Sequence, residues 1–226
     1  MTSQHVTILF QLIAFLFAIS VHESAHAWTA NLRGDPTARM LGRISLNPIR
    51  HIDPLGTVIL PLVAMFLHVP VLGWAKPTPV DPRNFKNHVL DDILTAVAGP
   101  ISNFLVAALA VAALGIIKMI SPLAQQLVFQ IAMGIPIESN SLLVPLCFLL
   151  YELMVINVVL AVFNLIPVPP LDGSHVVRHF MPPPMLRVYD TLGYVGLLIL
   201  VFWGGGLLFR LIIPFLNMFN SLLFRI

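Results

Sequence analysis

His22, Glu23 and His26 stand near the end of the first apolar stretch in the order His-Glu-x-x-His. On a helix, residues four apart lie on one face, so both imidazoles can bind one metal ion. Glu23 is turned about 100° aside, where a carboxylate can act as the base that activates water. This order of residues predicts a zinc hydrolase, with two histidine ligands and Glu23 as its catalytic base.

A catalytic zinc needs a third protein ligand. Asn164 ends the third apolar stretch, and a segment with three prolines leads from it to Asp172 and Gly173. Proline fixes φ and removes a backbone donor, so this segment cannot continue as an ordinary helix. Irregular backbone at membrane depth is tolerated only where it lines a cavity or is buried in protein. Asp172 is therefore the candidate third ligand, and its alternative role is that of a turn residue before Gly173.

The apolar surroundings of the histidines bear on their role. An ionisable group in hydrocarbon costs about 2.5 kcal/mol or more, so this cluster needs a compensating function. Two alternatives stay open beside the hydrolase: a transporter that relays protons or metal ions through these histidines, and a structural membrane protein in which they are satisfied at a helix end. A transporter should show ionisable residues stepping across the membrane on several helices. Here they concentrate toward one side, which favours the hydrolase.

The composition indicates an integral membrane protein. Of 226 residues, 58% are hydrophobic and 10% are charged, and the mean hydropathy is +0.92. Soluble proteins average about 25% charged residues, so a water-soluble domain is excluded. The sequence predicts one all-α polytopic membrane domain over residues 1–226, because no polar stretch is long enough for a second core. The net charge of +2 is too small to indicate nucleic-acid binding.

Two local features add expectations. Cys147 is the single cysteine and lies in an apolar run, so we expect a small buried hydrophobe and no internal disulfide. The N-terminus lacks a basic region and a small-residue cleavage site, so we expect the first apolar stretch to remain in the protein.

Four apolar stretches are long enough to cross about 30 Å of hydrocarbon: residues 7–30, 93–118, 142–166 and 191–224. Glycines, an arginine and a proline interrupt the last stretch, so it is two short spans, one broken helix, or a span with an interfacial segment. A fifth stretch, residues 55–72, is a span, a re-entrant hairpin or an extended loop. The catalytic core is expected at about residues 7–190, with the C-terminal membrane segment or segments after it.

Positive charges mark the cytoplasmic side of a membrane protein. They fall between the apolar stretches, at Arg33, Arg39, Arg43, Arg50, Lys76, Arg83, Lys86, Arg178 and Arg187, with none at 121–141. If residues 55–72 enter and return, all of these charges lie on one side. Asp172 can meet the two histidines only if the first and third stretches end on the same side, which requires the same path. We therefore favour a re-entrant segment, with the active site toward the cytoplasm.

These residues resemble the site-2 protease family of intramembrane zinc metalloproteases, in its compact bacterial and archaeal branch without a PDZ or CBS module. The resemblance covers about residues 10–180 and rests on His-Glu-x-x-His and on Asn-x-x-Pro-x-x-Pro-x-Asp-Gly, which ends at Gly173. Further similar segments are Gly34-Asp35-Pro36-Thr37-Ala38, Asn47-Pro48, Gly73-Trp74-Ala75-Lys76-Pro77 and Ala98-Gly99-Pro100-Ile101-Ser102-Asn103. Ser174-His175 depart from the family pattern, because many relatives have another glycine there.

The resemblance implies a three-helix catalytic core followed by C-terminal membrane helices, with a re-entrant or extended loop segment. It implies one zinc ion per chain, held by His22, His26 and Asp172, with Glu23 as the base. Asn164 corresponds to an asparagine that helps to hold the substrate or its oxyanion.

The resemblance also bears on residues around the site. Residues 73–77 look like an extended segment that presents an edge to an unwound substrate, which would then add as a strand. Because Asp172 completes the ligand set, His175 and His179 are expected to be polar or supporting groups and not ligands.

Polar residues also occur inside the apolar stretches. Glu152 is a relay element or an interfacial group, and Asn157 is expected to face protein or a cavity. Gly99, Ser102 and Asn103 form a stripe of small and polar side chains, which is typical of close helix packing.

The function implied is hydrolysis of peptide bonds within or near transmembrane segments, as in regulated intramembrane proteolysis. The expected substrate is a single-span membrane protein, and the expected location is the cell inner membrane, with several passes through the lipid bilayer. No nucleic-acid partner is expected. The residues specify neither the physiological substrate nor an oligomeric state.

Overall fold

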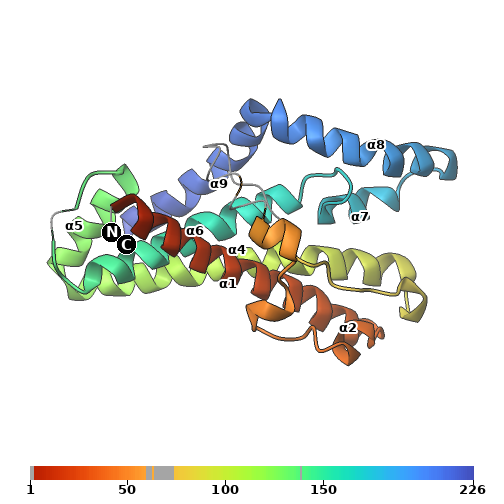
Figure 1. Cartoon of the computed structure of the whole chain (residues 1–226), viewed down its shortest axis with the longest axis horizontal. Coiled ribbons are helices and arrows are strands. Elements are labelled where there is room, and N and C mark those ends of the chain that lie inside the picture. Colours follow the sequence, from red (N-terminus) through yellow and green to blue (C-terminus); the bar gives the residue numbers. More distant parts are fainter. Residues whose placement is uncertain (1–2, 60–62, 64–73, 138) are drawn as a thin grey trace. The chain divides into compact units, whose positions relative to one another are not determined.

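The computed structural model describes residues 3–59, 63, 74–137 and 139–226. Contacts divide the chain into a larger unit, Met1–Ala18 with Pro100–Ile226, and a smaller unit, Ile19–Gly99. Helices α1 (Ser3–Arg33) and α4 (His88–Ile120) contribute residues to both units (Figure 1). Every regular element within the described ranges is helical, so the predicted all-α class is confirmed there.

Five helices of the described chain are long and apolar enough to cross a membrane. They are α1 from Thr7 onward, α4, α6 (Leu143–Asn164), α8 (Pro183–Phe202) and α9 (Gly205–Arg225). Their length and composition indicate a multi-pass membrane protein. The first three correspond to the apolar stretches predicted to begin at residues 7, 93 and 142, and those predictions are confirmed.

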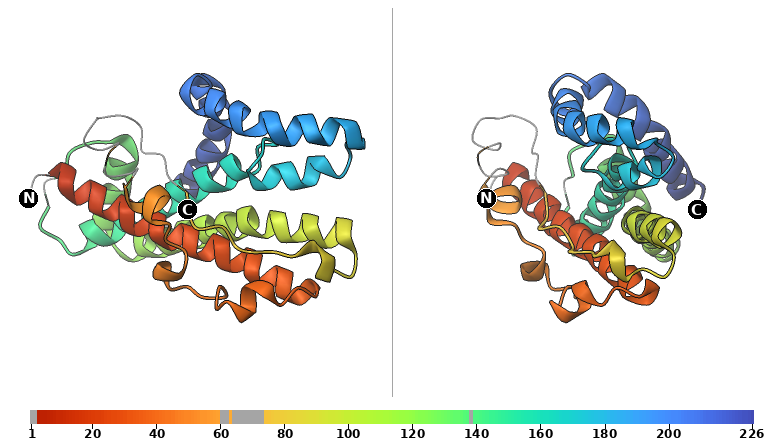
Figure 2. Two further views of the ribbon diagram at one scale, coloured as in Figure 1. Left: turned by 45° about the vertical axis from the view of Figure 1, so that its right-hand side comes forward. Right: turned by 90° about the vertical axis from the view of Figure 1, so that its right-hand side faces the viewer.

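The C-terminal stretch forms two helices, α8 and α9, which pack against each other (Figure 2). Helix α8 begins at Pro183 and not at the expected residue 191. Proline suits the first turn of a helix, where its missing N–H is not needed. The chain turns at Gly204 before α9 begins. A Cβ at Gly204 would lie 2.8 Å from Cα of Leu200, so this turn requires glycine.

A further helix, α5 (Pro122–Met133), lies where the sequence analysis predicts no element. The Ser121 side chain accepts a hydrogen bond from the Ala124 N–H at 3.4 Å and caps the first turn. Gly134 ends the helix at φ 65°, a left-handed conformation that favours glycine. With 12 residues, α5 is too short to span a membrane, and it packs against α6.

The fifth apolar stretch begins in a π-helical turn, η2 (Pro54–Ile59). The Asp53 carboxylate accepts hydrogen bonds from the N–H groups of Leu55 at 3.0 Å and Gly56 at 2.7 Å, and so caps this turn. Apart from residue 63, the rest of the stretch lies outside the described residues. The re-entrant path of residues 55–72 therefore stays a prediction.

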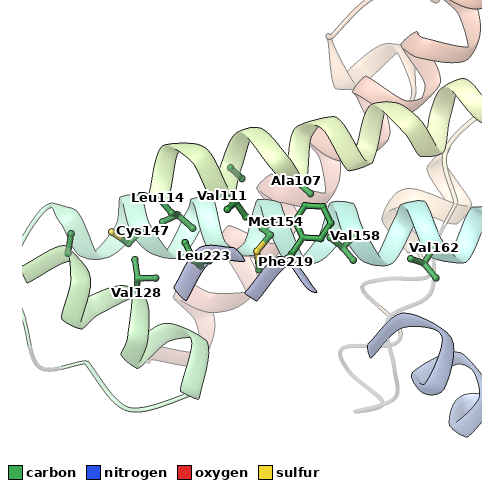
Figure 3. Packing of buried hydrophobic residues seen from close by; sticks show 12 residues of the cluster. Ala107, Val111, Leu114, Val128, Cys147, Met154, Val158, Val162, Phe219 and Leu223 are labelled. Carbon is green, nitrogen blue, oxygen red and sulfur yellow. The ribbon is translucent and has the colours of Figure 1, made fainter. Parts of the chain in front are cut away.

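The core of the larger unit lies where α4, α5, α6 and α9 pack together (Figure 3). Its buried members are Ala107, Ala110, Val111, Leu114, Ala124, Val128, Cys147, Met154, Val158, Val162, Phe219 and Leu223. Alanines allow α4 to approach its neighbours closely, which membrane helices rely on because lipid provides no hydrophobic force between them. Cys147 is free and buried, as predicted.

The smaller unit is organised around Asp35, which follows α1 and is fully buried. Its carboxylate accepts hydrogen bonds from N and Oγ1 of Thr37, from the Asp81 N–H at 2.7 Å and from Asn84 Nδ2 at 2.9 Å. Burial raises the pKa of Asp35, but these hydrogen bonds outweigh burial and hold the pKa below its ordinary value. Asp35 thereby joins the loop after α1 to η3 (Pro82–Asn84), just before α4.

Two short helices, α2 (Thr37–Met40) and η1 (Pro48–Arg50), lie in the loop that follows Asp35. The Arg43 side chain between them is buried. Its guanidinium donates to the carbonyl of Arg50 and, at 3.4 Å, to that of Pro77. This buried cation therefore ties the loop to the segment at residues 74–81.

We predict that Asp35→Asn lowers the thermal unfolding midpoint of the protein in detergent at neutral pH. The substitution replaces a charged acceptor with an amide. The two N–H donors of that amide face the groups that donate hydrogen bonds to Asp35 in the wild type. A loss of about 2 kcal/mol corresponds to about 4–8 °C for a chain of this size. Scanning calorimetry or intrinsic fluorescence measures the difference between the two proteins.

The pH dependence of that difference has a definite sign. Folding lowers the Asp35 pKa below the unfolded value of about 3.9. The stabilisation is therefore complete above about pH 4 and is lost as the pH falls through the folded pKa. The matched control is Asp190→Asn, because Asp190 is exposed and pairs with Arg178 at 3.1 Å, and such pairs contribute about 0–1 kcal/mol. Equal shifts in both variants, or a difference that grows in acid, contradict the prediction.

Candidate metal centre

Helix α1 places the His22 and His26 side chains one turn apart in the smaller unit. Their Nε2 atoms lie 3.0 Å from each other, and the two residues are 7% and 8% exposed. The rings are nearly perpendicular, at 84°. Two buried imidazole nitrogens this close share either a proton or an ion. The predicted pairing of the two histidines is therefore present in the structure.

The second ring nitrogen of His26 decides which nitrogen can bind a metal. Nδ1 lies 2.7 Å from the carbonyl oxygen of Thr95 in α4. A carbonyl accepts only, so Nδ1 carries the proton and donates it. In the neutral imidazole, Nε2 then keeps its lone pair, and it faces His22. Metal-ligating histidines are usually held in this way by a carbonyl or carboxylate, so the pair fits a metal site.

Gly99 lies one turn after Thr95 on the same face of α4, and it packs directly against both imidazoles. A Cβ at Gly99 would lie 2.6 Å from Cε1 and 2.7 Å from Nε2 of His22, and it would also overlap Nε2 of His26. Real side chains do not approach this closely. The close packing predicted for Gly99 is therefore present, and its partners are the two candidate ligands.

Ser24 fixes the rotation of this turn of α1 from another side. Its Oγ donates to the carbonyl of Ser45 and accepts from the Ser45 N–H at 3.2 Å. Nε2 of His51, which is fully buried, donates to the same carbonyl at 2.7 Å. The loop before η1 is thus held against the turn that carries the candidate ligands.

Glu23 is held by Thr78. Oε2 of Glu23 accepts from the Thr78 N–H at 2.9 Å and from Thr78 Oγ1 at 2.8 Å. The same hydroxyl lies 3.0 Å from the Glu23 carbonyl oxygen. The carboxylate predicted to be the base therefore has one oxygen fixed by a residue 55 positions later in the chain.

The segment around Thr78 directs most of its N–H groups into its own unit. The Trp74 N–H donates to Gly56 at 3.3 Å, and the Lys76 N–H donates to His51 at 2.8 Å. Pro77 and Pro79 have no N–H. The strand addition expected at residues 73–77 stays a prediction, and residue 73 lies outside the described residues.

Asp172 is the first residue of α7 (Asp172–Arg178), in the larger unit, and is half-buried. Leu171 before it is buried against Ile166 and Leu200. A Cβ at Gly173 would lie 2.5 Å from the carbonyl carbon of Leu165, so α7 begins in contact with the end of α6 only because residue 173 is glycine. The residues around Asp172 thus fix the point at which α7 begins, and Asp172 is the first residue of that helix.

Asn164 is the last residue of α6. Its Nδ2 donates to the Leu160 carbonyl at 3.0 Å, which uses one of the two amide hydrogens. Tyr189 Oη donates to the Pro167 carbonyl at 2.9 Å and ties the proline segment to α8. Asn164 and Asp172 therefore stand at the two ends of a segment held within the larger unit.

The other polar residues of α6 have contacts within the larger unit. Glu152 accepts from Gln11 Nε2 at 3.3 Å, which joins α6 to the first part of α1. Asn157 Nδ2 donates to the Leu153 carbonyl at 2.8 Å. The contact of Glu152 with Gln11 links two helices, and the predicted role of Glu152 as a relay element or an interfacial group stays a prediction. The roles of His175 and His179 in α7 stay predictions.

Sequence reasoning missed the contacts that hold the candidate ligands and base. The group that Thr95 contributes is a backbone carbonyl, which leaves no signal in a sequence. Thr78 carries a weak signal in the sequence, because a residue between two prolines has a restricted backbone conformation.

Comparisons with known proteins identify what the chain is similar to. The sequence profile of peptidase family M50 matches residues 10–203. The chain is 34% identical over 191 residues to a Bacillus subtilis (strain 168) protein named "Putative zinc metalloprotease YwhC", covering 83% of this chain and 78% of that protein. No solved structure matches the chain.

We predict that Gly99→Ala weakens metal binding. The added methyl group must displace both imidazoles, and disturbance of groups that support a metal site typically costs about 10- to 100-fold in affinity. Competition with a chromophoric zinc chelator measures the change. Gly205→Ala is the matched control, because a Cβ there meets no heavy atom within 4 Å. Wild-type zinc affinity in Gly99→Ala would contradict the prediction.

Proposed function

The chain belongs to peptidase family M50, the site-2 protease family of intramembrane zinc metalloproteases, and on that basis we propose a role for each site residue. His22, His26 and Asp172 together hold one zinc ion per chain. Glu23 is the general base, and Asn164 contacts the substrate near its scissile carbonyl. The observation that carries this proposal is the buried histidine pair, with its tautomer set by the Thr95 carbonyl.

The donor set is suited to zinc. Two imidazoles and one carboxylate make up a common protein ligand set for catalytic zinc. His26 keeps the Nε2 lone pair that binding requires, because its proton is held on Nδ1. Asp172 supplies the carboxylate, and its place in the first turn of α7 is supported by Gly173 packing on α6.

The reaction assigned to these residues is peptide-bond hydrolysis. When bound, zinc polarises the scissile carbonyl and makes water more acidic. Glu23 takes the proton from the attacking water and passes it to the leaving amine. Because Thr78 already holds Oε2, the proton is taken at Oε1, which accepts no hydrogen bond from any described residue. The lone pairs of Oε1 are therefore left for the water proton.

We assign to Asn164 the stabilisation of developing charge on the substrate. One of its amide hydrogens is used by Leu160, and the second is available to donate to an oxyanion. A donor aimed at such a charge in a site with little water contributes roughly 3 kcal/mol to catalysis.

The membrane helices and the family support a proposal on substrate class and location. We infer that α1, α4 and α6 form a three-helix catalytic core within a single domain of residues 1–226, and that the site faces the cytoplasm of the inner membrane. The substrate is a membrane protein, and we infer a single-span one that unwinds before cleavage, because a helix hides its peptide bonds in internal hydrogen bonds.

We predict that Glu23→Gln keeps about one zinc per chain and abolishes cleavage of a purified single-span fusion protein, because the amide cannot accept the water proton. His22→Ala and Asp172→Ala should lose zinc at neutral pH along with activity, since each removes a ligand. Elemental analysis of the detergent-purified proteins measures the zinc, and gel analysis of the fusion protein measures cleavage.

The matched controls for the ligand variants are His88→Ala and Asp190→Ala, which remove the same chemical groups at exposed positions. Both should keep zinc and activity. Full cleavage by Glu23→Gln would show that the base is another residue. Unchanged zinc in Asp172→Ala would move the third ligand to a different side chain.

We predict that Asn164→Ala lowers kcat by about 10²- to 10³-fold, the cost typical of losing one oxyanion donor. Zinc content should stay at the wild-type level, because Asn164 is not among the proposed ligands. Asn157→Ala is the control, since Asn157 makes the same kind of bond to the carbonyl four residues before it. If both variants lose activity equally, the effect comes from helix α6 and not from a donor to substrate.

A further inference from the structure

We propose that Thr78 is the positioning residue of the catalytic base, a role that rests on the proposed function of Glu23. Thr78 acts through Glu23 and does not touch the reacting atoms. Both of its donors, the backbone N–H and the side-chain Oγ1, are directed at the same carboxylate oxygen.

The geometry gives the two carboxylate oxygens different tasks. Oε2 lies 2.9 Å from Thr78 N and 2.8 Å from Thr78 Oγ1, and so accepts two hydrogen bonds. A glutamate side chain has three rotatable torsions, and a free one would populate several rotamers. Fixing Oε2 removes most of this freedom and gives Oε1 one direction. Proton transfer is fastest when the base is held in place before the reaction begins.

The hydroxyl of Thr78 also binds the helix that carries Glu23. Oγ1 lies 3.0 Å from the Glu23 carbonyl oxygen, so one hydroxyl hydrogen is shared between the backbone and the side chain of the same residue. Thr78 thereby links the Glu23 carboxylate to the Glu23 backbone. The carboxylate is therefore held at a fixed position relative to the turn of α1 that carries it.

Thr78 can position Glu23 because its own backbone is constrained. The rings of Pro77 and Pro79 fix φ on either side, and a residue before proline is confined to extended conformations. The flanking residues are held as well: the Lys76 N–H donates to the His51 carbonyl at 2.8 Å, and the Asp81 N–H donates to Asp35 at 2.7 Å. The backbone that carries the two donors of Thr78 is therefore held in place.

The substitution that tests this role is Thr78→Val, which keeps the branched shape and the N–H but removes the hydroxyl. With the purified single-span fusion protein as substrate, kcat should fall about 10- to 100-fold while KM and zinc content stay at wild-type values. Thr78→Ser restores the hydroxyl and should recover most of kcat. A role in packing alone predicts the opposite order, since valine replaces the methyl group and serine does not.

Thr57→Val is the matched control for loosening of the segment. Thr57 Oγ1 donates to the Trp74 carbonyl at 2.7 Å, so it holds the same segment without touching Glu23. This variant should keep kcat. An equal loss of kcat in Thr57→Val and Thr78→Val would overturn the proposal, and so would loss of zinc in Thr78→Val.

A second measurement does not depend on activity. In the metal-free protein, the thermal midpoints of Thr78→Val, Glu23→Ala and the double variant form a double-mutant cycle. The shift caused by Thr78→Val should be smaller when Glu23 is already absent. Additive shifts would show that the two side chains do not interact, which overturns the proposal.

The two hypotheses fail in different ways. If Glu23→Gln cleaves the fusion protein, the proposed base is wrong and Thr78 has no base to position. If Glu23→Gln is inactive but Thr78→Val cleaves with the wild-type kcat, Glu23 remains the base and the positioning role alone is overturned.

Discussion

Polar groups in an apolar helix must find their partners inside the protein, because hydrocarbon offers no hydrogen bonds. The histidine turn of α1 meets this constraint through a single turn of α4. The Thr95 carbonyl accepts a hydrogen bond from Nδ1–H of His26, and the missing side chain of Gly99 leaves the space that the imidazoles occupy. The same approach of α4 therefore sets both the position of the imidazoles and the nitrogen that is left to bind a metal. A larger residue at 99 would move the carbonyl away as well.

Consecutive residues of that turn are held by different parts of the smaller unit. His22 and His26 face α4, Ser24 is bound to the backbone of Ser45, and Glu23 is bound to Thr78. The turn is thus fixed from three directions by residues distant in the chain. Catalytic groups need such support, because misplacement by about 1 Å can cost 10²-fold in rate. Asp35 contributes indirectly, since it holds the segment that carries Thr78.

The parts that sequence reasoning predicts are those that repeat or occur in a fixed order. Long apolar stretches predict α1, α4 and α6, and His-Glu-x-x-His predicts the imidazole pair that the structure contains. Helix α5 was missed, although Ser121 and Gly134 are ordinary capping residues, because its length and composition do not stand out. Thr95 could not be found, since any residue offers a carbonyl. The grouping of Asp172 with the histidines is still inferred from the order of motifs and from family membership.

The prolines beside Thr78 have a consequence for aggregation. An extended segment in a membrane enzyme is exposed to unwound stretches of other proteins, and unpaired N–H and C=O groups invite such stretches to pair and aggregate. Pro77 and Pro79 remove two of these donors, and the N–H groups of Trp74, Lys76 and Thr78 are bonded within the protein. The described part of this segment, residues 74–79, therefore offers fewer backbone donors to indiscriminate strand pairing than an ordinary extended segment of the same length.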